Sequence, residues 1–206
     1  MSMKQRFTSA TCVALLLAAT VTAASAANLL TNPGFETGDL TGWQVFQGSA
    51  NAFVTVQSPD NGPALPGTHN AFISNQAEAG GLTLAQTTPN GSAVPGTVYY
   101  SFDLKLGQAA NGGVFFVEIF AQNAAGGVIS HGPGLLGNYT PANWTTFTGS
   151  FVAPANTDHL TIQFEAPTGA VVGTISTMHV DNVDLNQGSV VSAQSTSWGR
   201  MKALYR

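Results

Sequence analysis

The sequence predicts an all-β fold, a jelly-roll β-sandwich of two antiparallel sheets. Apolar residues fall in short runs of strand length, and Gly, Pro and Asn separate these runs. No run after residue 26 keeps a helical period over about eleven residues. Glycine accounts for 23 of the 206 residues and charged residues for only 8%, which disfavours both a helical bundle and a disordered chain. Short strands with turn signals between them are typical of sandwiches and jelly rolls.

The first 26 residues predict a secretory signal peptide. Lys4 and Arg6 precede an apolar run at residues 12–19, and residues 24–26 (Ala-Ser-Ala) provide the small residues of a cleavage site. The run is too short, and too interrupted by threonine, to predict a transmembrane anchor. We therefore expect a secreted protein, located in the extracellular space, at the cell surface or in the periplasm. Cys12 is the only cysteine, so the mature domain would have no disulfide and no thiolate metal site.

The distribution of charge disfavours one class of partner. The formal net charge is -4, from six basic and ten acidic residues. Without Lys4 and Arg6, four basic residues oppose ten acidic residues, a net charge of -6, whereas nucleic-acid binding needs clustered Lys and Arg. We expect residues 27–186 to form one domain, followed by a linker at 187–197. The basic and aromatic tail at 198–206 is interpreted as a sorting or docking segment, with a frayed terminus as the alternative.

Ten segments of the domain have strand length and are rich in β-branched and aromatic residues. They are residues 43–47, 52–57, 70–74, 82–87, 98–106, 113–122, 127–130, 144–152, 159–165 and 177–185. The segment 98–106 alternates between an apolar and a polar face, as a half-buried strand does. The segment 114–121 is apolar on both faces apart from Glu118. It is therefore either a central strand covered on both sides or a strand whose outer face forms the floor of a groove.

The stretch at residues 28–43, NLLTNPGFETGDLTGW, combines a short apolar strand with a tight turn. Pro33 fixes φ and Gly34 permits a left-handed backbone, so residues 32–34 predict the turn. Phe35 follows as an apolar anchor, and Glu36 beside it is one of the few charges in the chain.

Two further motifs come later in the chain, PGTHNAF at residues 66–72 and MHVDNVDL at residues 178–185. Together with the opening stretch, they resemble the CenC-type carbohydrate-binding modules of families 4, 9 and 22. Those modules have a galactose-binding-like jelly roll, and the resemblance extends over about residues 28–185. It implies that the chain is a non-catalytic module that binds a polysaccharide or glycan.

The resemblance also implies a structural Ca²⁺ near the chain ends. Glu36 and Asp181 match the family's carboxylate ligands, and Ca²⁺ takes six to eight oxygen ligands. The backbone carbonyls that complete the shell would come from Thr68, His69 and Asn70. Asn182 departs from the pattern, because many relatives carry a second acid there, which would weaken the site. The alternative is that both acids only cap turns or accept hydrogen bonds from backbone amides.

Sugars are recognised by aromatic faces that stack on C–H surfaces and by planar polar side chains that bond hydroxyls. The aromatic candidates for ligand binding are Tyr99, Tyr139 and Trp144, whereas Trp43 next to Phe35 is expected in the core. The candidate polar partners are Gln122, Asn143, Gln163 and Glu165.

Two alternative functions stay open. A glycoside hydrolase or lyase needs a pair of carboxylates across a cleft, and Asp103, Glu118 and Glu165 are the candidates. Glu118 stands out among them because it lies among aromatic residues. No local catalytic signature accompanies these acids, and the four histidines lack zinc-binding spacing. The other alternative is an extracellular matrix or adhesion protein that does not bind sugar.

Overall fold

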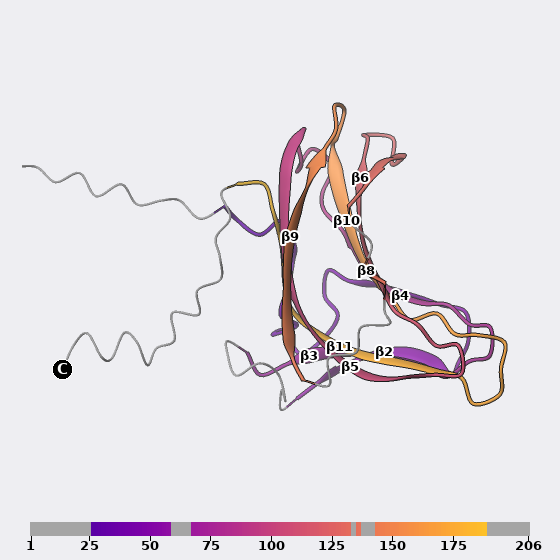
Figure 1. Ribbon diagram of the computed structural model, residues 1–206. Coiled ribbons are helices and arrows are strands. Elements are labelled where there is room, and N and C mark those ends of the chain that lie inside the picture. The colour runs from indigo at the N-terminus through magenta and orange to yellow at the C-terminus, as the bar shows by residue number, and fades with distance from the viewer. Residues whose placement is uncertain (1–25, 59–66, 133–134, 137–142, 189–206) are drawn as a thin grey trace, which may run out of the picture.

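The computed structural model describes residues 26–58, 67–132, 135–136 and 143–188 (Figure 1). Residues 1–25 of the expected signal peptide, most of the expected linker, the tail at 198–206 and Tyr139 lie outside these ranges. Within them the regular structure consists of β-strands, which confirms the all-β prediction. None of the described segments is a helix long and apolar enough to cross a membrane.

The described residues form two sheets in which every neighbouring pair of strands is antiparallel. In sheet A the order is β1 (Gln44–Gln47), β4 (Leu82–Thr87), β10 (His159–Glu165), β6 (Phe116–Gln122) and β7 (Val128–His131), and β8 (Leu135–Leu136) also pairs with β6. In sheet B the order is β2 (Ala52–Gln57), β3 (Asn70–Asn75), β11 (Ile175–Asn186), β5 (Gly96–Ala110) and β9 (Thr145–Ala153). This arrangement confirms the jelly-roll sandwich.

All ten expected strands are present, with ends that differ by a few residues. The largest difference is β5, which extends to Ala110 because it follows the long partner β11, with an irregularity in register between Thr177 and Met178. The two-residue strand β8 was not expected, since two residues carry no periodic signal.

The core lies between the two sheets and follows the alternation of side chains along the strands. In β5 the residues expected on the apolar face are all buried. They are Val98, Tyr100, Phe102, Leu104 and Leu106. Phe102 packs edge-on against Phe164 of β10, with ring centroids 5.5 Å apart, and so joins sheet B to sheet A.

The opening stretch closes one end of this core. Phe35 is fully buried, and its ring centroid lies 5.2 Å from that of Trp43, which is also buried as expected. Phe35 has a φ of 57°, which is unusual for a bulky side chain. Burying the phenyl ring contributes about 2–3 kcal/mol, which offsets a conformational cost of about 1–3 kcal/mol. The expectation for Gly34 was wrong, because the left-handed residues of this turn are Asn32 and Phe35.

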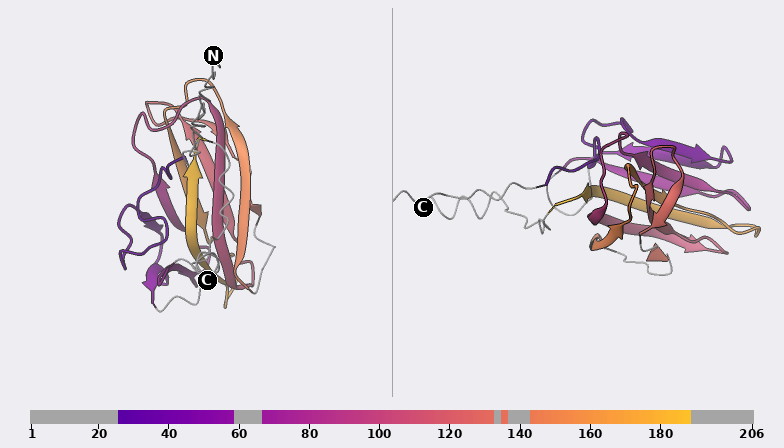
Figure 2. Two further views of the ribbon diagram at one scale, coloured as in Figure 1. Left: turned by 90° about the vertical axis from the view of Figure 1, so that its left-hand side faces the viewer. Right: turned by 90° about the horizontal axis from the view of Figure 1, so that it is seen from above.

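The two ends of the described chain meet on one side of the sandwich (Figure 2). The amide of Leu29 donates to the carbonyl of Leu185 at 2.8 Å, and the Asn28 side chain donates to the carbonyl of Val183 at 2.7 Å. Both sheets curve, and sheet A lies on the inner side of the curve (Figure 1). The outer face of sheet A is therefore concave, whereas that of sheet B is convex.

Candidate functional site

The outer face of sheet A gathers the polar side chains of its two central strands. In β10 the residues Leu160, Ile162 and Phe164 are buried in the core, so the alternate residues Thr161, Gln163 and Glu165 point outward. In β6 the buried residues are Val117, Ile119 and Ala121. The outward residues of β6 are Phe116, Glu118, Phe120 and Gln122. This strand is thus apolar on both faces, as expected, and its outer side is a surface of the protein.

The strand register arranges these outward residues in three rows across the sheet. The first row contains Phe46, Thr83, Glu165 and Phe116. The second contains Gln44, Ala85, Gln163 and Glu118. The third contains Thr87, Thr161, Phe120 and His131. Aromatic rings therefore lie on either side of a polar centre, and Phe46 at the edge is 58% exposed.

Hydrogen bonds connect the polar centre. The side-chain amide of Gln163 donates to Glu118 Oε2 at 3.0 Å and also to Glu165 Oε1. The Thr161 hydroxyl donates to Gln122 Oε1 at 2.5 Å and lies 2.8 Å from the Thr87 hydroxyl. The side-chain amide of Gln122 is held in turn by the Gly126 carbonyl at 3.1 Å. These bonds fix planar polar groups in positions where hydroxyl groups of a ligand can reach them.

In the part of the chain that the structure describes, no lysine or arginine accompanies the two carboxylates at this centre. Lys105 is the only lysine among the described residues, which contain no arginine, and it lies in β5 of sheet B. Burial raises the pKa of Glu165, and the charge of Glu118 raises it further. The outer face of sheet A is consequently acidic and rich in hydrogen-bond acceptors.

The residues expected to bind sugar are divided between the two sheets. Gln122, Gln163 and Glu165 come together on the outer face of sheet A. Tyr99 lies in β5 of sheet B, opposite Ser150 of β9.

The remaining aromatic candidates do not join that group. Trp144 and Asn143 directly precede β9, and the Trp144 ring lies 6.0 Å from His179 of β11. Tyr139 lies outside the described residues. The residues that sequence reasoning missed are Phe46, Phe116 and Phe120. The two-faced apolar pattern of residues 114–121 was the signal for Phe116 and Phe120.

The three carboxylates considered for catalysis do not face one groove. Glu118 and Glu165 lie on neighbouring strands and share the amide of Gln163. Asp103 is in sheet B, where it is buried and accepts hydrogen bonds from the Thr146 hydroxyl at 2.5 Å and from Asn182 Nδ2 at 2.9 Å. Only Glu118 and Glu165 remain as a candidate pair.

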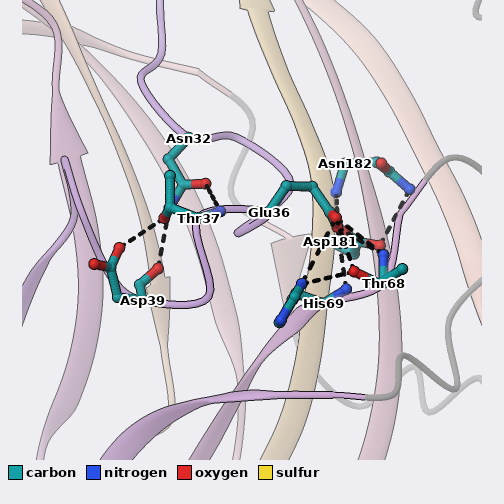
Figure 3. A network of polar contacts seen from close by, with 8 residues as sticks. All are labelled: Asn32, Glu36, Thr37, Asp39, Thr68, His69, Asp181 and Asn182. Carbon is teal, nitrogen blue, oxygen red and sulfur yellow. Dashed lines mark hydrogen bonds and ion pairs between the residues drawn. The ribbon is translucent and has the colours of Figure 1, made fainter.

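A second candidate site lies where the chain ends meet (Figure 3). Glu36 and Asp181 both approach Gly34: a Cβ atom on Gly34 would be 3.5 Å from Asp181 Oδ1 and 3.7 Å from Glu36 Cγ. The backbone is held there by Val183, whose amide donates to the Pro33 carbonyl at 3.0 Å. The structure thus brings together the two acids that the sequence resemblance paired.

The surroundings of these acids fit a calcium ion in part. No lysine or arginine among the described residues neutralises them. However, the backbone N–H groups of Thr68 and His69 donate to the Glu36 carboxylate at N···O distances of 2.9–3.1 Å. Asp181 Oδ1 accepts a hydrogen bond from the backbone amide of Asn182 at 2.7 Å.

Residues 68–70 do not provide the expected shell of carbonyl ligands, because Thr68 and His69 present N–H groups to Glu36. Burial raises the pKa of Glu36, but the hydrogen bonds from Thr68 and His69 outweigh it, and the pKa lies below its ordinary value. The Asn70 side chain is engaged with His179, 2.9 Å from its Nδ1. The described residues contain no cluster of three or more His, Cys, Asp or Glu side chains suited to a metal. A metal here would depend on two carboxylates and backbone oxygens.

No protein-family model matches the sequence, and no curated protein matches it. Solved structures match its fold. The enzymatically active domain of tailspike protein 4 from bacteriophage CBA120 is similar, with a TM-score of 0.61 and 15% identity over 77% of this chain. This chain spans only 21% of that phage protein.

Whole carbohydrate-binding modules match over nearly their full length. A family 61 module solved in complex with beta-1,4-galactotriose has a TM-score of 0.54 and 18% identity, covering 79% of this chain and 99% of the module. The CBM22-1 xylan-binding domain from Paenibacillus barcinonensis has a TM-score of 0.50 and 16% identity, covering 79% and 95%. At these identities the likeness is one of fold. The expected resemblance to a carbohydrate-binding jelly roll is confirmed at that level.

Proposed function

We propose that this protein is a secreted, non-catalytic carbohydrate-binding module that holds a polysaccharide or glycan on the outer face of sheet A. The observation that carries the proposal is the combination, on the inner side of the curved sandwich, of aromatic rings with a hydrogen-bonded polar centre. The similarity of fold to whole carbohydrate-binding modules supports it. Fold alone would not, because one fold hosts many functions.

The arrangement suits an extended ligand. Phe46, Phe116 and Phe120 offer ring surfaces for the C–H faces of sugars, and Gln122 and Gln163 offer planar amides for hydroxyl groups. From β1 to β7 the face crosses five strands, a width of roughly 19 Å at the usual strand spacing. That width suits an oligosaccharide segment better than a single sugar.

Calcium is the second part of the proposal. A Ca²⁺ ion between Glu36 and Asp181 would neutralise two carboxylates that lie side by side, and it would link the first and last segments of the domain. Its role is structural, because this junction is formed by the chain ends and not by the sugar-binding face. Export through residues 1–26 and docking of a partner by the tail at 198–206 complete the proposal.

Glycoside cleavage is a second candidate function, favoured by the raised pKa of Glu165 beside Glu118. Such a pair has the chemistry of an acid and a base in glycosidases. Gln163 bonds both acids, however, and occupies the position between them where a glycosidic bond would have to lie.

A panel of soluble and insoluble polysaccharides, assayed for both retention of the protein and release of reducing ends, separates these functions. Retention without cleavage is the expected result. Cleavage that is lost in Glu165→Gln would assign an enzyme. The absence of both would contradict the proposal and favour a matrix or adhesion protein.

A further inference from the structure

Within the described ranges, the outer face of sheet A carries two carboxylates and no lysine or arginine, and this bears on which glycans it would accept. The outward residues of β1 and β4 are uncharged, β10 and β6 contribute Glu165 and Glu118, and β7 contributes His131 beside Phe120. His159, at the start of β10, is engaged by Asp158 at 2.9 Å. Residues 133–142 contain no charged side chain.

The two carboxylates keep much of their capacity to accept hydrogen bonds. Each ionised carboxylate has about four lone-pair sites. Within the described part of the chain, the hydrogen bonds made to Glu118 and Glu165 come from the single amide group of Gln163. By contrast, Glu36 at the chain ends accepts from two backbone amides and one hydroxyl. The pair on sheet A is therefore available to a ligand, whereas Glu36 is largely occupied by the protein.

We propose that Glu118 and Glu165 give the outer face of sheet A a preference for glycans that carry ammonium groups, the de-N-acetylated hexosamine polymers, over neutral glycans. An ammonium group on the solvent side of the Gln163 amide would donate hydrogen bonds to the remaining acceptor sites of both carboxylates. The sugar rings on either side of it would stack on Phe116 and Phe120. Uronic acid polymers would be repelled by the same pair.

Two dependences follow from this geometry. Binding of an ammonium group favours the ionised form of Glu165, so affinity rises as the pH increases through the raised pKa of Glu165. Affinity falls again when the ligand amine itself loses its proton. Salt weakens the preference, since added ions screen exposed charge pairs, with a Debye length of about 8–10 Å at 0.1–0.15 M ionic strength.

The experiment compares chitosan hexaose with chitin hexaose, which have the same backbone and length and differ in the acetyl groups. Calorimetric titration at pH 6 and low salt is expected to show at least tenfold tighter binding of chitosan hexaose. The preference should fall to less than threefold in Glu118→Gln/Glu165→Gln, and in Glu165→Gln alone it should fall by an intermediate factor. Glu78→Gln, an exposed acid outside sheet A, should keep the full preference. Oligogalacturonate is expected not to bind.

This inference rests on the proposed function, and the experiment distinguishes their failures. Equal binding of the two hexaoses, or a preference that survives in the double variant, would overturn the inference and leave the proposed function standing. Binding of oligogalacturonate would overturn it too. If no glycan binds, neutral ones included, although the melting curve shows that the protein is folded, both the inference and the proposed function are overturned.

Discussion

The outer faces of the two sheets use similar residues in different ways. On sheet B, aromatic rings cover one another in a continuous chain: Phe53 and Phe72 are 6.3 Å apart, Phe72 and His179 are 4.7 Å apart, and His179 and Trp144 are 6.0 Å apart. On sheet A, none of the described rings packs against Phe46 or Phe116. The two faces thus differ in how far the protein itself covers their rings, since on sheet A only Phe120 has a described ring, His131, packed against it. A ring that other rings cover has less surface left for stacking on a sugar.

The carboxylates of the two faces differ in the same way. Asp103 and Asp181 of sheet B are buried, and protein donors such as Asn182 bond both of them. Glu118 and Glu165 of sheet A are half-buried and share one donor. The acids of sheet B are thus bonded within the fold, whereas those of sheet A keep acceptor sites for the ligand that we propose.

Truncating aromatic rings on sheet A should give the largest effect. Phe46→Ala/Phe116→Ala is expected to weaken glycan binding about a hundredfold, because each ring in contact with a sugar contributes roughly 1–1.5 kcal/mol. The matched control is Phe53→Ala, which removes a 39% exposed ring from sheet B and should leave affinity within twofold. Calorimetric titration with the best ligand from the polysaccharide panel measures both. Equal losses in the two variants would show that the faces do not differ.

Removing calcium should affect stability and leave sugar affinity unchanged. For protein loaded with calcium at about 100 times its dissociation constant, the ion contributes about 2.7 kcal/mol, so chelation should lower the melting temperature by about 5–10 °C. Glu36→Gln should lose most of this difference, and Glu78→Gln should keep it. Scanning calorimetry with and without chelator gives the comparison. Identical curves for metal-loaded and chelated protein would remove the ion from the account.

Neutralising Glu165 should stabilise the fold at neutral pH. Its pKa is raised in the folded protein, so ionisation costs stability as the pH rises above the ordinary value of 4.5. Glu165→Gln is therefore expected to raise the melting temperature by roughly 1–3 °C at pH 7, the effect of less than about 1 kcal/mol in a domain of this size, and to have little effect at pH 4. A lower melting temperature at pH 7 would mean that the acid stabilises the fold. Asp103→Asn on sheet B should lower it instead, because an NH2 group would replace one of the two oxygens that accept hydrogen bonds from Thr146 and Asn182.

The smallest effect is expected from protonation of Glu36. Its pKa is lowered by hydrogen bonds from Thr68 and His69, which outweigh burial. The stability that Glu36 contributes is thus present above about pH 4.5 and is lost as the pH falls through its lower folded pKa. Metal-free protein should melt at a lower temperature below pH 4, and Glu36→Gln should show a shallower decline over the same range. Parallel declines in the two proteins would assign the acid sensitivity to other groups.

The sequence was sufficient for the fold because strands and turns leave local signals. The alternation in residues 98–106 and the turn at residues 32–34 depend on neighbours in the chain, and both features are present. The backbone detail of that turn was less accessible: Phe35 takes the left-handed conformation expected of Gly34, since its ring enters a core that distant strands build.

The site was predictable only in part, because membership of a face depends on the order of strands in the sheets. Gln122 and Gln163 were identified as polar partners, and β6 and β10 place them on one face. Tyr99 and Trp144 are chemically as well suited to stack on a sugar, yet Tyr99 lies in β5 and Trp144 directly precedes β9, and both strands belong to sheet B. Phe46 comes from an edge strand of four residues, and nothing local indicates that β1 pairs with β4.

The central claim, that sugar binds on the outer face of sheet A, is tested most directly by NMR titration of the protein with its best glycan. The side-chain amide signals of Gln122 and Gln163 report on that face, and the indole N–H of Trp144 and the side-chain amide of Gln57 report on sheet B. We predict that the two amide signals on sheet A shift in a saturable manner while the signals on sheet B do not. Saturable shifts confined to Trp144 and Gln57 would contradict the account and place the ligand on the convex face.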